Sequence, residues 1–188
     1  MKTLLFDNYD SFTYNIANAL RELGIENLSV ARNDKISVEE MRKFDKIIFS
    51  PGPGIPKDAG VMESAIKELA SEKTILGVCL GHQAIGEVFG AKLENLSRPF
   101  HAVQSQMKIV KTTPLFNGLS DGFLAGRYHS WVVSKENFPD CLEISAVEEN
   151  GQIMALRHKQ YNVFGLQFHP ESILTPEGAK ILDNFLKL

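Results

Sequence analysis

Apolar positions in the first half of the chain follow two alternating periodicities. Short apolar runs at residues 4–6, 28–31, 46–49 and 74–78 predict buried strands. Apolar residues recur at helical spacing within residues 12–23, 61–69 and 81–89, and Ser37 with Glu40 forms a capping-box pattern that predicts another short helix. Strands and helices that alternate in this way predict an α/β fold with a mostly parallel sheet flanked by helices.

The second half of the chain is richer in strands and ends in a helix. Strand-like runs, which predict a smaller antiparallel sheet, lie at residues 103–110, 122–125, 142–147, 153–157 and 163–168. Thr175 and Pro176 predict the start of the last helix, with the proline at its first position. No linker or repeat interrupts the pattern, so we expect residues 1–188 to form a single domain.

Composition and charge restrict the classes of protein further. The 188 residues carry a net charge of −3, which argues against a protein that binds nucleic acid through clustered basic residues. No apolar run approaches the roughly 18 residues that a membrane-spanning helix needs. The two cysteines, Cys79 and Cys141, cannot form a disulfide framework. We therefore expect a cytoplasmic protein that binds neither nucleic acid nor membrane.

Cys79 lies in a pattern that is typical of a nucleophile. Gly77, Cys79 and Gly81 form a G-x-C-x-G motif between a predicted strand and a predicted helix, as in the strained turns that present a nucleophile above an α/β sheet. The helix N-terminus would stabilise a thiolate and supply free N–H groups for an oxyanion. A lone cysteine is more often a small core residue, which is what we expect of Cys141.

His169 is the best candidate for the base that a catalytic thiol needs. It closes a predicted strand, and Pro170 holds it extended, so that Glu171 can reach the imidazole from two residues away. A carboxylate there would complete a set of nucleophile, base and orienting acid. The alternative is an ordinary surface histidine. A zinc deaminase is not expected, because the chain lacks the P-C-x-x-C cysteine pair that accompanies His-x-Glu in those enzymes.

The segment Ser50-Pro51-Gly52-Pro53-Gly54 follows a predicted strand and cannot be regular structure. It lacks the Lys-Ser/Thr pair of a P-loop. Its N–H groups could approach a ligand carbonyl, or it could be a plain turn.

Together, residues 50–54, 77–83 and 167–171 resemble the motifs of the class I (triad-type) glutamine amidotransferases, and the match runs over nearly the whole chain. Residues 7–15 (DNYDSFTYN) and residues 127–130 (RYHS) are similar to the branch that contains the glutaminase components of anthranilate synthase and aminodeoxychorismate synthase. The resemblance implies a flavodoxin-like fold in which Cys79 is the nucleophile, His169 the base and Glu171 its partner.

The same resemblance implies a glutamine site around the nucleophile. A backbone N–H of the glycine loop and that of Leu80 would form the oxyanion hole, and Gln83 would touch the substrate. Ser130 and Trp131 would contact the amino-acid end of glutamine largely through main chain. The residues that would line this site are Gly52, Pro53, Gly54, Leu80, Gln83, Ser130 and Trp131.

The partners that the resemblance implies are L-glutamine and a chorismate-binding synthase component I, in a hetero-oligomer. No cofactor is expected in this chain, and Mg²⁺ is expected on the partner. Because the amidotransferase fold accounts for all 188 residues, a separate chain docked over the active-site mouth is expected to take up the ammonia. Anthranilate synthesis, in the tryptophan route, is the expected reaction, with aminodeoxychorismate synthesis, in the folate route, or service to both as alternatives.

Two positions depart from the family pattern. Trp131 stands where the family usually has leucine, and residues 101–104 read His-Ala-Val-Gln where His-Gly-Lys is common. Other hypotheses are a stand-alone γ-glutamyl thiol hydrolase and a non-catalytic binding subunit.

The remaining polar residues carry weaker expectations. His82 and His129 are interpreted as structural or pocket-lining residues. Surface positions are expected for His101, His158 and the pairs Glu39-Glu40 and Glu148-Glu149.

Overall fold

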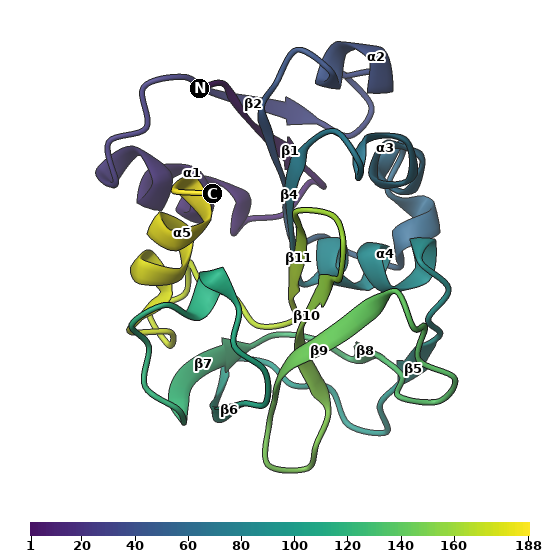
Figure 1. The fold of residues 1–188 in the computed structure, drawn as a ribbon, viewed down its shortest axis with the longest axis vertical. Helices are drawn as coiled ribbons and strands as arrows, with labels where there is room; N and C mark the ends of the chain where they lie inside the picture. The colour runs from purple at the N-terminus through teal and green to yellow at the C-terminus, as the bar shows by residue number, and fades with distance from the viewer.

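A computed structural model describes residues 1–188, and a nine-stranded sheet forms its centre (Figure 1). Five neighbouring strands are parallel: β2 (Leu28–Arg32), β1 (Thr3–Asp7), β3 (Lys46–Phe49), β4 (Thr74–Val78) and β11 (Val163–Leu166). The sheet continues with four antiparallel strands: β10 (Ile153–His158), β9 (Leu142–Val147), β6 (Val103–Ile109) and β7 (Phe123–Arg127). The predicted α/β fold is therefore confirmed, and the antiparallel strands extend the parallel sheet.

Helices cover both faces of the parallel strands (Figure 1). The helices are α1 (Thr13–Glu22) and α5 (Gly178–Leu186) on one face, and α2 (Val38–Met41), α3 (Met62–Leu69) and α4 (Leu80–Val88) on the other. Alternate strand residues point to opposite faces, so Leu5 and Ile48 pack in one buried cluster, while Leu4 and Ile47 pack in the other. None of the helices combines the length and apolar character required to cross a bilayer.

The parallel strands bring three chain segments to one edge of the sheet. β3, β4 and β11 are neighbours, so their carboxyl ends meet there. The loop at residues 50–54 follows β3, Cys79 follows β4, and His169 lies three residues after β11. Ligand sites of open α/β sheets form at this edge. A functional site is therefore expected there.

The capping box at α2 is confirmed, because Ser37 accepts a hydrogen bond from the Glu40 N–H and donates its own N–H to the Glu40 carboxylate. The predicted start of the last helix is wrong. α5 begins at Gly178, since Thr175 and Pro176 belong to a turn in which the Gly178 N–H donates to the Thr175 carbonyl.

The sequence pattern missed two short strands. β5 (Leu93–Asn95) and β8 (Trp131–Val133) pair as a separate antiparallel sheet. Each has only three residues, which is too short to show an alternating pattern. Two single 3₁₀ turns, η1 (Pro56–Asp58) and η2 (Pro114–Phe116), complete the regular structure.

Candidate active site

Cys79 occupies the tight turn between β4 and α4. Its backbone has φ 51° and ψ −97°, a strained conformation for a residue that carries a Cβ atom. Its N–H donates to the carbonyl of Leu166 at 2.7 Å, which ties the turn to the end of β11. The strain and the anchor together hold the sulfur at the edge of the sheet.

The two glycines of the motif are required by close backbone approach. A Cβ on Gly77 would lie 2.4 Å from the backbone of Gly81, and a Cβ on Gly81 would lie 2.7 Å from the carbonyl oxygen of Phe49. Real Cβ atoms do not come so near to other backbone atoms. The turn at Cys79 therefore depends on glycine at both positions.

The backbone of His169 is held on both sides. Its N–H donates to the carbonyl of Gly126 at 3.0 Å, in an isolated antiparallel bridge between the segment that follows β11 and strand β7. Its carbonyl accepts the hydroxyl of Thr175 at 2.6 Å, and the same hydroxyl oxygen accepts the Gly126 N–H at 3.0 Å. Thr175 therefore links the two segments instead of beginning the last helix.

The imidazole of His169 is fixed by Glu171 and by two aromatic rings. Nδ1 lies 2.7 Å from Oε1 of Glu171, and both side chains are buried. An ionised carboxylate only accepts hydrogen bonds, so Nδ1 carries a proton. The rings of Phe12 and Tyr128 pack against the imidazole with centroids 5.0 and 4.8 Å away. Nε2 is buried and makes no hydrogen bond to a nitrogen or oxygen atom of the protein, so the Cys79 sulfur is the protein group with which it can share a proton.

Cys79 and His169 line one cavity of about 240 Å³. Burial lowers the pKa of His169, but the Cys79 sulfur and the Glu171 carboxylate favour the imidazolium more strongly, so the pKa rises to about 10. A positive imidazolium beside a thiolate is the arrangement that activates a cysteine nucleophile. The structure thus brings together the three residues that sequence reasoning selected.

The N-terminal block builds one wall of this cavity. Oδ1 of Asp7 accepts hydrogen bonds from the N–H of Tyr9 at 2.9 Å and from the hydroxyl of Thr13 at 2.9 Å. This turn carries Asp10 and Phe12 to the cavity lining. The block therefore shapes the space beside the imidazole.

Sequence reasoning did not identify three residues of the cavity wall. Phe12, Tyr128 and His101 line it, and the ring of His101 packs edge-on against Tyr128. His101 is exposed as predicted, but it lies at the mouth of the cavity. Phe12 and Tyr128 lie in segments that the family resemblance singled out, residues 7–15 and 127–130. No pattern within these segments indicates that the two rings meet the imidazole, because that contact joins distant parts of the chain.

The glycine loop lies against the first turn of α4. A Cβ on Gly52 would lie 2.6 Å from Cβ of Asn8 and 2.7 Å from Cδ2 of Leu80, so only glycine fits there. Gly52 lines the cavity, whereas Pro53 and Gly54 are exposed. Leu80 is the first residue of α4, where backbone N–H groups have no acceptor within the helix. Both N–H sources of the predicted oxyanion hole therefore lie beside Cys79.

Comparison with known proteins decides the family. The family model for glutamine amidotransferase class-I matches residues 4–188. The chain belongs to the class I glutamine amidotransferases. It is 48% identical to anthranilate synthase component 2 of Cyanophora paradoxa, over 97% of each chain.

Two further comparisons place this amidotransferase among its relatives. It is 42% identical to the bifunctional protein TrpGD of Thermotoga maritima, a match that covers 100% of this chain and 32% of that longer protein. A solved structure of a putative GMP synthase subunit from Thermoplasma acidophilum has a TM-score of 0.87 at 25% identity, with 100% of this chain and 93% of that one covered. The fold of the amidotransferase is therefore shared beyond its nearer relatives.

Three groups of the amidotransferase that were predicted to contact glutamine already make hydrogen bonds within the protein. Gln83 is buried, and its Nε2 donates to the carbonyl of Trp131 at 3.0 Å and to Oε1 of Gln167 at 3.2 Å. The Trp131 carbonyl also contacts Nδ1 of His129 at 3.0 Å, and the Ser130 carbonyl accepts the Leu96 N–H at 2.7 Å. The groups left for a ligand are Oε1 of Gln83, the Ser130 hydroxyl and main-chain N–H groups.

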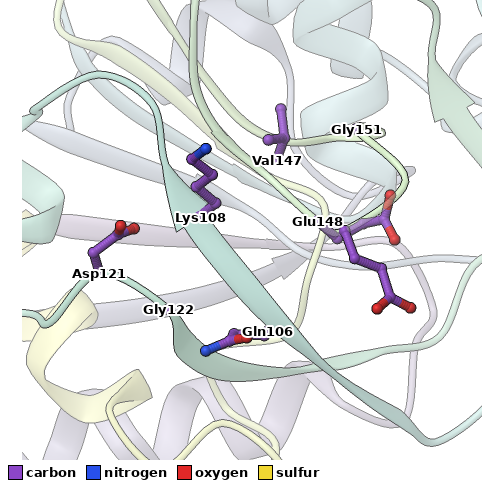
Figure 2. A pocket seen from close by; sticks show the side chains of 8 residues that line it. Gln106, Lys108, Asp121, Gly122, Val147, Glu148 and Gly151 are labelled. Atoms are coloured by element: carbon purple, nitrogen blue, oxygen red, sulfur yellow. The ribbon is translucent and has the colours of Figure 1, made fainter.

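A larger hollow of about 460 Å³ lies apart from the catalytic cavity of the amidotransferase. Figure 2 shows Lys108 and Asp121 on one side of it and Glu148 and Gly151 on the other. The prediction that Glu148 is a solvated residue is wrong, because its buried carboxylate pairs with Arg127 at 3.3 Å. No group of three His, Cys, Asp or Glu side chains in the structure could hold a metal ion.

His82, His129 and His158 are buried in the amidotransferase. Burial lowers the pKa of His82 to about 3, and its ring packs against Gly165 of β11. Burial and the charge of Arg127 lower the pKa of His129 to about 3 as well. The predicted surface position of His158 is wrong, because its buried ring stacks on Tyr161 with centroids 4.3 Å apart. Cys141 is half-buried and packs against the core.

Proposed function

We propose that this amidotransferase hydrolyses L-glutamine and passes the ammonia to a chorismate-using synthase subunit that makes anthranilate. One observation carries the proposal: the strained Cys79 and the Glu171-paired His169 line the same cavity. The relatives named anthranilate synthase component 2 support the specific reaction, because they match this chain over nearly their whole length.

The first half of the reaction forms a thioester. The Cys79 thiolate attacks the side-chain amide carbon of glutamine, and the carbonyl oxygen becomes an oxyanion. The N–H of Leu80 and an N–H of the glycine loop stabilise that charge; losing one such donor typically raises the barrier by about 3 kcal/mol. The His169 imidazolium gives its Nε2 proton to the amide nitrogen, the C–N bond breaks, and ammonia leaves.

The second half returns the enzyme to its starting state. Neutral His169 takes a proton from water as the water oxygen attacks the thioester carbon. The C–S bond breaks, glutamate leaves, and the thiolate and imidazolium are restored. Glu171 keeps the imidazole in one tautomer throughout and stabilises its positive charge. The sum is glutamine plus water giving glutamate plus ammonia.

Glutamine is held by residues around this centre. We assign Gly52, Pro53 and Gly54 to one side of the substrate and Gln83, through Oε1, to the other. The Ser130 hydroxyl and the main-chain N–H groups at Ser130 and Trp131 bind the amino-acid end. Because residue 131 contacts glutamine largely through main chain, tryptophan serves there where leucine is usual.

The partner in this proposal is a chorismate-binding component I that receives ammonia before it can protonate and diffuse away. The words "component" and "subunit" in the names of the relatives support such a hetero-oligomer. We propose that this chain uses no cofactor and that Mg²⁺ serves the partner. A cytoplasmic location stays a prediction.

The test is to purify the chain with its partner from native extract and to supply chorismate with either glutamine or ammonium. We expect anthranilate from both nitrogen sources. The Cys79→Ala complex should lose the glutamine-dependent product and keep the ammonium-dependent one, and a Cys141→Ala complex should keep both.

Three results would contradict parts of this proposal. Glutamine-dependent product in the Cys79→Ala complex would refute the nucleophile. The 4-amino isomer in place of anthranilate would move the chain to the aminodeoxychorismate reaction. Rapid glutamine hydrolysis with no partner in the extract would favour a stand-alone thiol hydrolase.

A further inference from the structure

A buried hydrogen-bonded chain ends at the Cys79 sulfur. Nε2 of Gln167 lies 3.6 Å from the sulfur, within reach of an N–H···S hydrogen bond, and Gln167 has no exposed surface. Gln167 comes directly after β11, so its backbone is fixed by the sheet. The mechanism above leaves this buried amide without a role.

The orientation of the Gln167 amide follows from its neighbours. The Trp131 carbonyl can only accept, so the group of Gln83 that faces it must be the N–H donor. The second N–H of that group then points to Gln167 at 3.2 Å, and the Gln167 atom there must be the oxygen. The Gln167 NH₂ group is therefore turned toward the sulfur of Cys79.

The far end of the chain places a second donor, His129, on the same Trp131 carbonyl. Nε of Arg127 can only donate, and it lies 3.2 Å from Nε2 of His129. In neutral His129 the proton must then be on Nδ1, which donates to the Trp131 carbonyl at 3.0 Å. The low pKa of His129 agrees with this neutral form.

Arg127 itself is held rigidly. It is buried, and its Nη1 lies 3.3 Å from Oε2 of Glu148. Its Cζ lies 3.5 Å from the centroid of the Phe100 ring. Glu148 in turn accepts the backbone N–H groups of Asn150 and Gln152 at 2.9 Å each, at the hollow shown in Figure 2. Each donor in the chain from Arg127 to Cys79 therefore faces an acceptor.

We propose that Gln167 is a further catalytic residue, whose amide N–H donates to the Cys79 sulfur and stabilises the thiolate, and that Gln83 and His129 are positioning residues that keep the amide in this orientation. Hydrogen bonds to charged groups are stronger than those between neutral groups, so the N–H favours the thiolate over the thiol. His169 acts on the same sulfur from the cavity. The thiolate is thus stabilised by the Gln167 N–H as well as by the imidazolium.

This proposal rests on the proposed function for its place in glutamine hydrolysis, but its test does not use glutamine. In a Cys141→Ala background, iodoacetamide alkylation of Cys79 is followed by mass spectrometry between pH 5 and pH 9. The rate rises with the thiolate fraction, so the profile gives a pH midpoint for each variant. Absence of glutamine hydrolysis would count against the proposed function, but the alkylation profile would still test the role of Gln167.

Two substitutions at Gln167 remove the donor in different ways. Gln167→Met has no N–H and no charge, and Gln167→Glu keeps the acceptor for Gln83 but faces the sulfur with an oxygen. We expect both to raise the midpoint by about one pH unit, which is about a tenfold slower alkylation below the midpoint. Gln83→Leu should raise it by less, because the Gln167 amide remains but can rotate.

The matched control is Gln160→Glu, the same substitution at an exposed glutamine. It should leave the midpoint unchanged. A merely structural role for Gln167 would lower the thermal unfolding midpoint without moving the alkylation profile. The proposal is overturned if folded Gln167→Glu and Gln167→Met keep the profile of the parent protein, and its positioning part is overturned if only Gln83→Leu does so.

Discussion

Nδ1 of His169 and Oε1 of Glu171 are 2.7 Å apart, and both side chains are withdrawn from solvent. A charge pair so placed holds the imidazole in one tautomer and stabilises its protonated form. Nε2, the nitrogen that exchanges protons with the substrate in the proposed reaction, makes no hydrogen bond to a nitrogen or oxygen atom of the protein. Glu171 therefore acts on the reaction through His169 and not through the substrate.

Glu171→Gln should lower kcat for glutamine hydrolysis by between about 10²- and 10⁴-fold, as loss of an orienting carboxylate does in comparable triads. KM should change little. The pKa of His169 is raised to about 10 by Cys79 and Glu171 against the effect of burial. Without Glu171 the imidazolium loses its proton at lower pH, so the alkaline limb of activity should move down. Steady-state kinetics against pH measure both effects.

The matched control for this variant is Glu39→Gln, which neutralises an exposed carboxylate. It should keep the kinetics of the parent protein. Unchanged kcat in Glu171→Gln would show that the carboxylate is not part of the catalytic set.

Phe12 packs on the imidazole of His169 with centroids 5.0 Å apart and on the ring of Tyr128 at 4.9 Å. Aromatic pairs of this kind contribute about 1 kcal/mol beyond burial. Phe12→Leu should let the imidazole turn away and lower kcat about fivefold, the rate equivalent of that energy. Tyr14→Leu, at a side chain that is 58% exposed, is the control. Equal kcat for both variants would remove Phe12 from the site.

The turn at Cys79 requires glycine at position 81, where a Cβ would lie 2.7 Å from the Phe49 carbonyl oxygen. Gly81→Ala should lower the free energy of unfolding by about 3 kcal/mol and abolish glutamine turnover. Gly24→Ala meets no atom within 4 Å but has φ +84°, so it should cost about 1 kcal/mol and keep turnover. Urea unfolding and activity assays distinguish them, and an active Gly81→Ala protein would contradict the strained turn.

The buried imidazole of His82 should make the free energy of unfolding depend on pH. Burial lowers its pKa to about 3 in the folded protein, whereas the unfolded chain binds the proton near pH 6.5. The unfolded state therefore gains protons first, and the stability due to neutral His82 is lost as pH falls from 6.5 toward 3. Between pH 6.5 and 4.5 the free energy of unfolding of the parent protein should fall by roughly 2 to 3 kcal/mol more than that of His82→Leu.

Urea unfolding at the two pH values measures this difference for His82. His101→Leu, at an exposed histidine, should follow the parent protein. Parallel pH profiles for the parent and His82→Leu would contradict a buried neutral imidazole.

The sequence predicted most of the parallel half of the fold and selected Cys79, His169 and Glu171, which the structure brings together. Both depend on local patterns: apolar runs that alternate with amphipathic helices, and the glycines that flank Cys79. The family resemblance also holds, because its motifs are contiguous in sequence. These features can be recognised without knowing which distant residues are in contact.

Errors arose where a residue's environment depends on distant segments. Glu148 directly follows β9, and it is buried because Arg127 of β7 supplies the charge that it needs. His158 is buried because Tyr161 and Phe89 cover its ring. Thr175 does not begin the last helix, because its hydroxyl joins His169 to Gly126. The chain of hydrogen bonds behind Cys79 likewise joins three separate segments, and no local pattern indicates it.

The central claim is that the sulfur of Cys79 attacks glutamine. The direct test is to react the protein, with its partner, with a glutamine-like diazo-ketone and to map the modified peptide by mass spectrometry. The account predicts one adduct per chain, on Cys79, with loss of glutamine hydrolysis in proportion to labelling and protection by excess glutamine. An adduct on Cys141 alone, or full hydrolysis by a protein completely labelled at Cys79, would contradict it.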